Sequence, residues 1–415
     1  MRYTKYLLIL FLIAGPWILT PLFAQEPLSL ETLLEEAMRS SPEIEAARQE
    51  WEAMKEGIPQ ARSLEDPQFS ITQWSIPSNF NIGNADETWY GIGQAFPFPG
   101  KLQLKGQISA KEADISGQGY LAKVREVASK VKSSYYQLSL IHKAIDLHLE
   151  HQALLEEFIT IAEQKYAVGQ VSQQDILKAQ VELSKLHNSL LLLEQEKISI
   201  QAEINRLLNR SPEGLLGQPE ESSFRPFTMT LEGLEQMALR EKPELMAANF
   251  TIERSEKAKA LAKKNYLPDF MVEIQYWDVH IGPNRWMAMG KINLPWIFRA
   301  KYDSRTRQAK AEEDRARADY MALRNQTQFE IKDLFVRIKT SEHLIQVYKD
   351  GILPQAEQSL AAARIAYQAG KADFLNLIDS ERTLRDFQLE YYTALTQYEQ
   401  FIAKLEQEVG TELKF

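Results

Sequence analysis

Apolar and small residues recur every three or four positions along the first half of the chain, most clearly from Val124 to Tyr166. This heptad-like stripe is typical of long helices that pack side by side. No proline interrupts residues 100–211, and a helix from Leu102 to Tyr166 would be on the order of 95 Å long at ~1.5 Å per residue. Because no globular core has that length and charged residues cover the remaining faces, the pattern predicts long antiparallel coiled-coil helices.

The helical pattern stops and restarts at two similar short sequences. They are Tyr166-Ala-Val-Gly169 and Tyr367-Gln-Ala-Gly370. A glycine supplies the left-handed residue that ends many helices, and Ser172 or Asp373 can then cap the next helix by accepting its free N–H groups. Each sequence therefore predicts the tip of a helical hairpin, at about residues 166–172 and 367–373.

The second half repeats this organisation, with helices expected from about Ala300 to Tyr367 and from Asp373 to Val409. Pro354 lies inside the first of these helices. Because proline has no N–H to donate and its ring clashes with the preceding turn, we expect a kink or a change of register there.

The two tips are 201 residues apart, and the same offset relates other parts of the two halves. Without a gap, the residues Leu30, Glu31, Leu33, Ala37, Arg39, Pro42 and Glu43 correspond to Leu231, Glu232, Leu234, Ala238, Arg240, Pro243 and Glu244. The offset falls to 198 at Pro97 and Pro295, which indicates a loop difference of three residues. The chain is therefore interpreted as one unit duplicated, with a first repeat at residues 25–219 and a second at residues 220–415.

Each repeat also contains a stretch in which apolar residues alternate with more polar ones. In the second repeat the alternation runs from Phe270 to Trp277 and again from Trp286 to Leu294; in the first it is weaker, over residues 69–76 and 89–96. Strand hairpins are expected at about residues 67–97 and 268–295. Aromatic residues cluster near the strand ends, as in the interfacial girdles of transmembrane barrels: Trp74, Trp89, Tyr90, Tyr276, Trp277 and Trp286. Alternation alone leaves an ordinary soluble sheet as an alternative.

Composition and the amino-terminus narrow the class of protein. The net charge of -9 argues against a nucleic-acid-binding protein, and the absence of cysteine excludes disulfides, thiolate nucleophiles and cysteine metal sites. Arg2 and Lys5 precede an apolar run over residues 6–19, and Ala24 precedes Gln25, so residues 1–24 are predicted to be a removable signal peptide. No later window has the ~20 apolar residues that a membrane-spanning helix needs.

Four strands of membrane length cannot close a barrel within one chain. The smallest known single-chain barrels have about eight strands, and open sheet edges are not tolerated in lipid. If the hairpins cross a membrane, the chain must therefore oligomerise, and its helices would continue the barrel wall into an aqueous compartment as a tube.

Taken in order, these features resemble the TolC-type outer-membrane efflux proteins over the whole mature chain. Besides the duplication and the tips, the matching features are the hairpin entries Asp66-Pro67 and Pro268-Asp269, the exits Phe96-Pro-Phe-Pro-Gly-Lys101 and Leu294-Pro-Trp-Ile-Phe298, and the sequences Leu353-Pro354-Gln-Ala and Asp379-Ser-Glu-Arg-Thr-Leu384. The resemblance implies an α-helical tunnel plus a transmembrane β-barrel closed by trimerisation. It also implies a belt around the tunnel, built from about residues 209–238 and the residues after Val409.

The function implied by the resemblance is a passive channel in the cell outer membrane whose helices extend into the periplasm. Such a homotrimer would dock through its tips to a periplasmic adaptor (membrane fusion protein) and an inner-membrane pump of the RND or ABC type. It would be no enzyme and would hold no cofactor. The compact length and the exit at Pro97 to Lys101 are more similar to the heavy-metal branch (cobalt-zinc-cadmium or copper) than to drug-efflux or type I protein-secretion ducts, which stay open as alternatives. A soluble periplasmic coiled-coil adaptor is a further alternative.

The resemblance also assigns roles at the tips. The periplasmic aperture is expected at Asp379, Asn376 and Asp175, and the adaptor-docking tips at Tyr166, Gly169, Tyr367 and Gly370. Three copies of Asp379 would favour cations in the aperture. The sequence departs from the family at Asn376, where relatives have an acid, and at Ala372, where some relatives have an arginine that bonds the residue at the position of Asp175. Lys371 and Arg364 are the cations available to replace that arginine.

Two clusters carry side chains that suit metals. His142, His148 and His151 share one predicted helix, and Met271, Met287 and Met289 lie on the presumed lumen face of two strands. Imidazoles suit Zn or Cu, and thioethers suit Cu(I). Because a passive channel needs no tight site, we expect packed or solvated roles for both clusters and no metal site. No spacing of catalytic residues indicates an enzyme.

Overall fold

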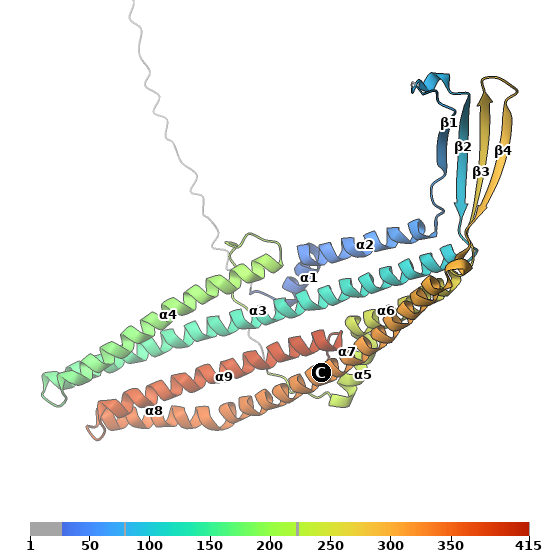
Figure 1. Cartoon of the computed structure of the whole chain (residues 1–415). Coiled ribbons are helices and arrows are strands. Elements are labelled where there is room, and N and C mark those ends of the chain that lie inside the picture. The colour runs from blue at the N-terminus through green and yellow to red at the C-terminus, as the bar shows by residue number, and fades with distance from the viewer. Residues whose placement is uncertain (1–26, 79, 221–223, 415) are drawn as a thin grey trace, which may run out of the picture.

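The computed structural model describes residues 27–78, 80–220 and 224–414. It consists of a long bundle of helices with a narrow antiparallel sheet that projects from one end (Figure 1). The helices of the first repeat are α1 (Leu30–Ser40), α2 (Pro42–Arg62), α3 (Lys101–Ala167) and α4 (Gln173–Leu207). Those of the second are α5 (Leu231–Glu241), α6 (Pro243–Lys264), α7 (Arg299–Val347), α8 (Leu353–Gln368) and α9 (Phe374–Val409).

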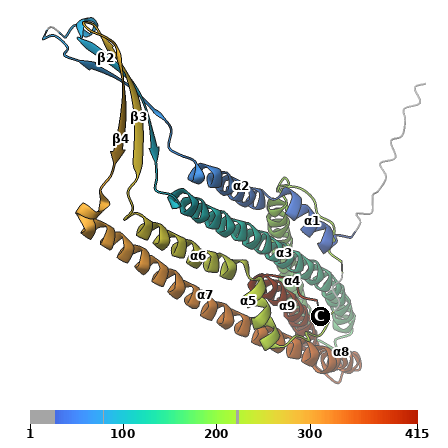
Figure 2. The ribbon, with the colours of Figure 1, turned by 90° about the vertical axis from the view of Figure 1, so that its right-hand side faces the viewer.

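The long uninterrupted helix predicted in the first half is present as α3, which has 67 residues. It packs along α2, α4, α6 and α9, so both repeats contribute to one bundle (Figure 2). Apolar side chains at three- and four-residue spacing, including Val127, Val131, Leu138 and Ile141, are fully or almost fully buried. Within the described residues, no helix is both long enough and apolar enough to cross a membrane.

The irregularity predicted at Pro354 is confirmed. A π-helical turn, Tyr348–Ile352, separates α7 from α8, and Pro354 is in the first turn of α8. A wider turn accommodates a residue that cannot donate to the carbonyl four positions earlier and whose ring needs space there. At the equivalent position of the first repeat, Ala153 lies inside the continuous α3.

The strands of both repeats form one sheet in the order β1-β2-β3-β4, with all pairs antiparallel. Strands β1 (Gln68–Trp74) and β2 (Glu87–Phe96) belong to the first repeat, and β3 (Phe270–Val279) and β4 (Arg285–Ile292) to the second. In the described part of the chain, β1 and β4 each pair on one side only, so the sheet has two open edges.

The two faces of the sheet differ in chemistry. One face presents exposed apolar side chains from all four strands: Phe69, Ile71, Tyr90, Ile92, Phe270, Val272, Ile274, Trp286 and Ile292. On the other face, Lys291 Nζ lies 2.9 Å from Glu273 Oε2. An added Cβ at Gly91 would lie 2.5 Å from Ser70 Oγ and 3.1 Å from Glu273 Oε1, and one at Gly93 would lie 2.8 Å from Met271 Cε.

A polar joint fixes the sheet to the helices. The buried Lys101, the first residue of α3, donates from Nζ to the Leu267 carbonyl oxygen and to Asp269 Oδ1, both at 2.8 Å. Asp269 Oδ1 also accepts from the backbone N–H of Phe98 at 2.7 Å. The joint therefore ties the exit of the first hairpin to the entry of the second.

Near the middle of the bundle, the segment that joins the repeats meets the amino-terminal segment. Leu28 N donates to the Gln218 carbonyl oxygen at 2.8 Å, and Tyr135 of α3 donates to the Leu28 carbonyl oxygen at 3.1 Å. Burial raises the pKa of Tyr135 to about 12, so its hydroxyl stays protonated. On the second repeat, Lys242 and Glu408 form a buried ion pair beside the end of α9.

We predict that Lys101→Met destabilises the folded chain by roughly 1.5–3 kcal/mol, the usual contribution of hydrogen bonds that involve a charged group. The substitution keeps the length of the buried stem but leaves Asp269 and the Leu267 carbonyl without the ammonium group. Thermal unfolding of the purified protein measures the effect. The matched control is Lys105→Met, one turn further along α3, where the side chain is exposed; an equal effect of both substitutions would contradict a specific role for the joint.

Candidate functional site

The end of the bundle opposite the sheet is formed by the two helical hairpin tips (Figure 1). Gly169 has φ 76° and Gly370 has φ 72°, the left-handed conformation expected at these positions. Each helix ends with the same backbone bond: Gln170 N donates to the Lys165 carbonyl oxygen at 2.9 Å, and Lys371 N donates to the Ala366 carbonyl oxygen at 2.8 Å. Both predicted tips are therefore true helix terminations.

The caps of the returning helices differ. Asp373 Oδ1 accepts from Leu375 N at 3.5 Å, as expected of a cap. The expected side-chain cap by Ser172 is wrong, because its hydroxyl makes no capping bond and Asp175 N instead donates to the Ser172 carbonyl oxygen at 3.2 Å.

The equivalent tyrosines of the two tips lie in different environments. Tyr166 is 47% exposed, whereas Tyr367 is 2% exposed and packs edge-on against Phe374, with ring centroids 5.3 Å apart. Lys165 of the first tip lies over the Tyr367 ring at 5.2 Å and donates to the Gln368 carbonyl oxygen at 3.0 Å. Burial, reinforced by the nearby Asp175, raises the pKa of Tyr367 to about 12. The second tip is thus docked against the first.

The docked tips share one apolar core. Leu155, Phe158 and Ala162 of α3 and Ala179 and Leu186 of α4 pack with side chains of the second hairpin in a single buried cluster, whose members there are Ala356, Leu360, Tyr367, Phe374, Leu377, Ile378 and Leu384. Because both hairpins contribute, separating the tips would expose apolar surface to water.

Ion pairs join the same two hairpins. Arg364 of α8 pairs with Glu157 of α3, and Arg382 Nη2 of α9 lies 2.7 Å from Glu182 Oε1 of α4. Although burial opposes ionisation, Lys185 and Arg382 lower the pKa of Glu182. Of the two cations expected to replace the missing arginine at Ala372, Arg364 does reach the first hairpin, but it binds Glu157.

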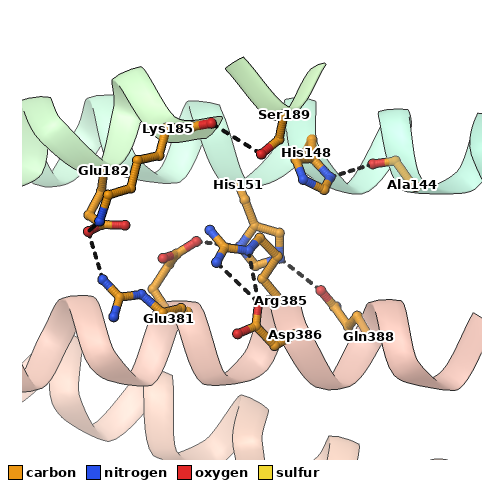
Figure 3. A network of polar contacts seen from close by, with 11 residues as sticks. Ala144, His148, His151, Glu182, Lys185, Ser189, Glu381, Arg385, Asp386 and Gln388 are labelled. Atoms are coloured by element: carbon orange, nitrogen blue, oxygen red, sulfur yellow. Dashed lines mark hydrogen bonds and ion pairs between the residues drawn. The ribbon is translucent and has the colours of Figure 1, made fainter. Parts of the chain in front are cut away.

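A buried polar link joins α3 to α9 next to the ion pair between Arg382 and Glu182 (Figure 3). His151 of α3 is 1% exposed; its Nδ1 is 2.9 Å from Glu381 Oε1 and its Nε2 is 2.8 Å from Gln388 Oε1, both on α9. This link was not predicted. Its signal is present in the sequence, because Glu381 occupies a position of the apolar stripe that Leu377, Ile378 and Leu384 define, and an acid buried there requires a partner.

The three histidines do not assemble a metal site. His148 bonds the Ala144 carbonyl oxygen of its own helix at 2.8 Å, and burial lowers its pKa, which favours the neutral ring. Over residues 27–78, 80–220 and 224–414, no group of three or more histidine or acidic side chains could hold a metal ion. Met271, Met287 and Met289 lie in register with Lys291, Gln275 and Glu273 respectively, on the polar face of the sheet.

The residues expected at the aperture lie on the first turns of α4 and α9. Asp379 and Asn376 are exposed, while Asp175 is half-buried near Tyr367. Since Phe374, Leu377 and Ile378 point into the shared core, Asp379 and Asn376 occupy the opposite, solvent-exposed side of α9. Asp175 therefore lies in a different environment from Asp379 and Asn376.

A groove runs between α4 and α9 beside these residues and has a volume of about 360 Å³. Its wall is mostly apolar, with Leu177, Val181 and Leu375 each more than half exposed. Lys178, Glu182 and Arg382 form its charged rim. A groove of this kind can receive apolar side chains of another helix.

Both repeats of the chain match a known protein family. A family described as outer membrane efflux protein matches residues 33–210 and 234–411, one match in each repeat. The chain belongs to this family. The resemblance to TolC-type channels is thereby confirmed, and as an outer membrane efflux protein the chain is a transport protein and no enzyme.

Individual relatives of this outer membrane efflux protein are distant but full-length. The cobalt-zinc-cadmium resistance protein CzcC of Cupriavidus metallidurans is 24% identical over 402 residues, covering 94% of this chain and 93% of the relative. The outer membrane protein VceC of Vibrio cholerae has a similar structure, with a TM-score of 0.79 at 18% identity, covering 93% and 97% of the two chains. CusC has a TM-score of 0.80 at 16% identity and covers 92% of each.

We predict that Tyr367→Phe leaves this efflux protein as stable as the parent chain or more stable, by up to about 1 kcal/mol. The Tyr367 hydroxyl is buried and has no hydrogen-bond partner among the described residues, so removing it breaks no bond. Tyr367→Ala should instead cost about 3–5 kcal/mol, because it opens a cavity in the core of the tips. Thermal unfolding tests both substitutions, with Tyr166→Ala at the exposed equivalent position as the control; equal losses at the two tips would contradict the difference in packing.

Proposed function

We propose that this chain is the passive exit duct of a tripartite efflux system, inserted in the cell outer membrane with its helices in the periplasm. The observation that carries the proposal is the two-faced sheet at one end of the bundle. Its apolar face is exposed and its edges are open, whereas the helices of the bundle from which it projects present many charged side chains to water (Figure 1). A lipid bilayer would cover the apolar face, and other copies of the chain would pair the edges.

The assembly proposed is a homotrimer. Four strands from each of three copies would give a barrel of twelve, above the minimum of about eight found for membrane barrels. Apolar side chains also remain exposed at helical spacing on α4 and α7, which supports contacts between copies along the bundle. They are Leu177, Val181, Leu191, Leu192 and Ile198 on α4, and Met321, Phe329, Val336, Leu344 and Val347 on α7.

The tips are proposed as the docking surface for a periplasmic adaptor, which links the duct to an inner-membrane pump of the RND or ABC type. In this arrangement the Tyr166, Gly169, Tyr367 and Gly370 region forms the end of the duct, and the groove between α4 and α9 receives adaptor side chains. Asp379, Asn376 and Asp175 are proposed to line the aperture.

The cargo proposed is a heavy-metal cation. Support comes from the full-length relationship to a cobalt-zinc-cadmium resistance protein and from the acid at position 379. No resident metal site is needed, because a passive duct only has to let the ion pass. Efflux of drugs or other small molecules and type I protein secretion are the alternative cargoes.

Fractionation of the exported chain tests the proposal directly. We predict that the chain sediments with outer membranes, resists salt extraction, and has the native mass of three chains once solubilised in detergent. A salt-extractable periplasmic monomer would contradict the duct and would favour a soluble coiled-coil adaptor.

We also predict that Asp379→Asn lowers the cation selectivity of the duct in planar bilayers and weakens its block by divalent cations. A unit charge at ~4 Å in water contributes about 1 kcal/mol, so local cation occupancy should fall roughly fivefold. Reversal potentials in a salt gradient provide the measurement. The matched control is Asp319→Asn, which changes an exposed acid on α7 far from the tips. Unchanged reversal potentials in Asp379→Asn would contradict a role for Asp379 in the aperture.

A further inference from the structure

Tryptophans and an arginine form a continuous row across all four strands of the sheet. The Trp74 and Trp89 rings stack with centroids 5.3 Å apart and planes at 13°, and Trp89 and Trp277 stack at 4.2 Å and 9°. The guanidinium carbon of Arg285 lies 4.7 Å from the Trp277 ring centroid. The four side chains come from β1, β2, β3 and β4 in that order, so the row runs from one open edge of the sheet to the other.

Hydrogen bonds hold the middle of the row in place. Trp89 Nε1 donates to Glu87 Oε2 at 2.8 Å, and Arg285 Nη2 donates to Glu87 Oε1 at 2.9 Å. Trp277 Nε1 donates to Gln275 Oε1 at 2.9 Å. These bonds orient the ring planes and the guanidinium before any partner arrives, which lowers the entropic cost of a contact at either end.

The two ends of the row are complementary. At the β1 edge, Trp74 is 58% exposed although one of its neighbours is the stacked Trp89. At the β4 edge, the Arg285 side chain is 56% exposed. A guanidinium attracts the face of an indole within about 6 Å of its centroid. The indole exposed at the β1 edge can therefore bind a guanidinium such as the one exposed at the β4 edge.

We propose that Arg285 of one copy of the chain stacks on Trp74 of the next copy. This inference rests on the proposed duct and specifies the contact at which its sheets join. With four antiparallel strands per chain, β4 of one copy runs antiparallel to β1 of the next, as a ladder between the two edges requires. Three indoles and one guanidinium from each copy then form a closed ring on the polar face of the barrel wall, and this ring sets the register between copies.

Cysteine cross-linking tests the contact, because the parent chain contains no cysteine. The double variant Trp74→Cys with Arg285→Cys, in isolated outer membranes, is treated with a bismaleimide that spans the ~7–8 Å of a diagonal cross-strand pair. We expect a covalent trimer on denaturing gels. Each single variant and the pair Gln73→Cys with Arg285→Cys are the controls, since Gln73 lies on the opposite face of β1; they should stay monomeric.

A second measurement does not depend on cysteine. Trp74→Ala and Arg285→Ala should each lower the temperature at which the trimer dissociates in detergent, and the double variant should lower it by less than the sum of the two, because the single variants share the loss of one contact between copies. Fully additive effects, or trimers of correct native mass that do not cross-link through positions 74 and 285, would overturn the contact and leave the duct intact. A chain that forms no trimer at all would overturn the duct itself.

Discussion

Within one copy, the described residues leave the apolar face of the sheet uncovered and its two edge strands unpaired on one side. This constraint shapes the rest of the molecule. Its apolar face is exposed, and the backbone groups of β1 and β4 point outward from two open edges. In water such a sheet would aggregate through its edges. In lipid it would leave polar backbone groups unpaired at a high cost. The proposed duct would solve both problems, because lipid would cover the apolar face, identical sheets would pair at their edges, and the long helices would hold the sheets in position for that closure.

Much of the fold was predictable because its signals are local. Long helices follow from periodicity, the hairpin tips from Gly169 and Gly370, and the irregular turn from Pro354. The duplication showed which segments should be alike before any contact was known. Even the sheet followed from alternation, although the pairing of β2 with β3, which merges two hairpins into one sheet, joins residues too far apart in sequence for a local pattern to specify.

The candidate site was harder to predict, because it depends on how α3 and α9 lie against each other. Tyr166 and Tyr367 are equivalent in sequence, but only Tyr367 is buried, since the second tip packs against the first, whereas the described residues leave Tyr166 about half exposed. His151 was grouped with its helical neighbours as a possible metal ligand, whereas its partners Glu381 and Gln388 lie more than 200 residues away. Sequence patterns identify which residues share a face of one helix and give no information about the helix opposite.

The glycines of β2 affect the width of the proposed channel. Gly91 and Gly93 carry no side chain, and Ser70, Glu273 and Met271 occupy the space where a Cβ would stand. If that face lines a water-filled lumen, the side chains around Gly91 and Gly93 would leave it wider there than at the row of Trp89, Trp277 and Arg285, which lies on the same face nearer the hairpin loops. Within the proposed duct, β2 would therefore give the barrel a wider segment between the aromatic row and the helices, and the tips would remain the proposed place where flow is restricted.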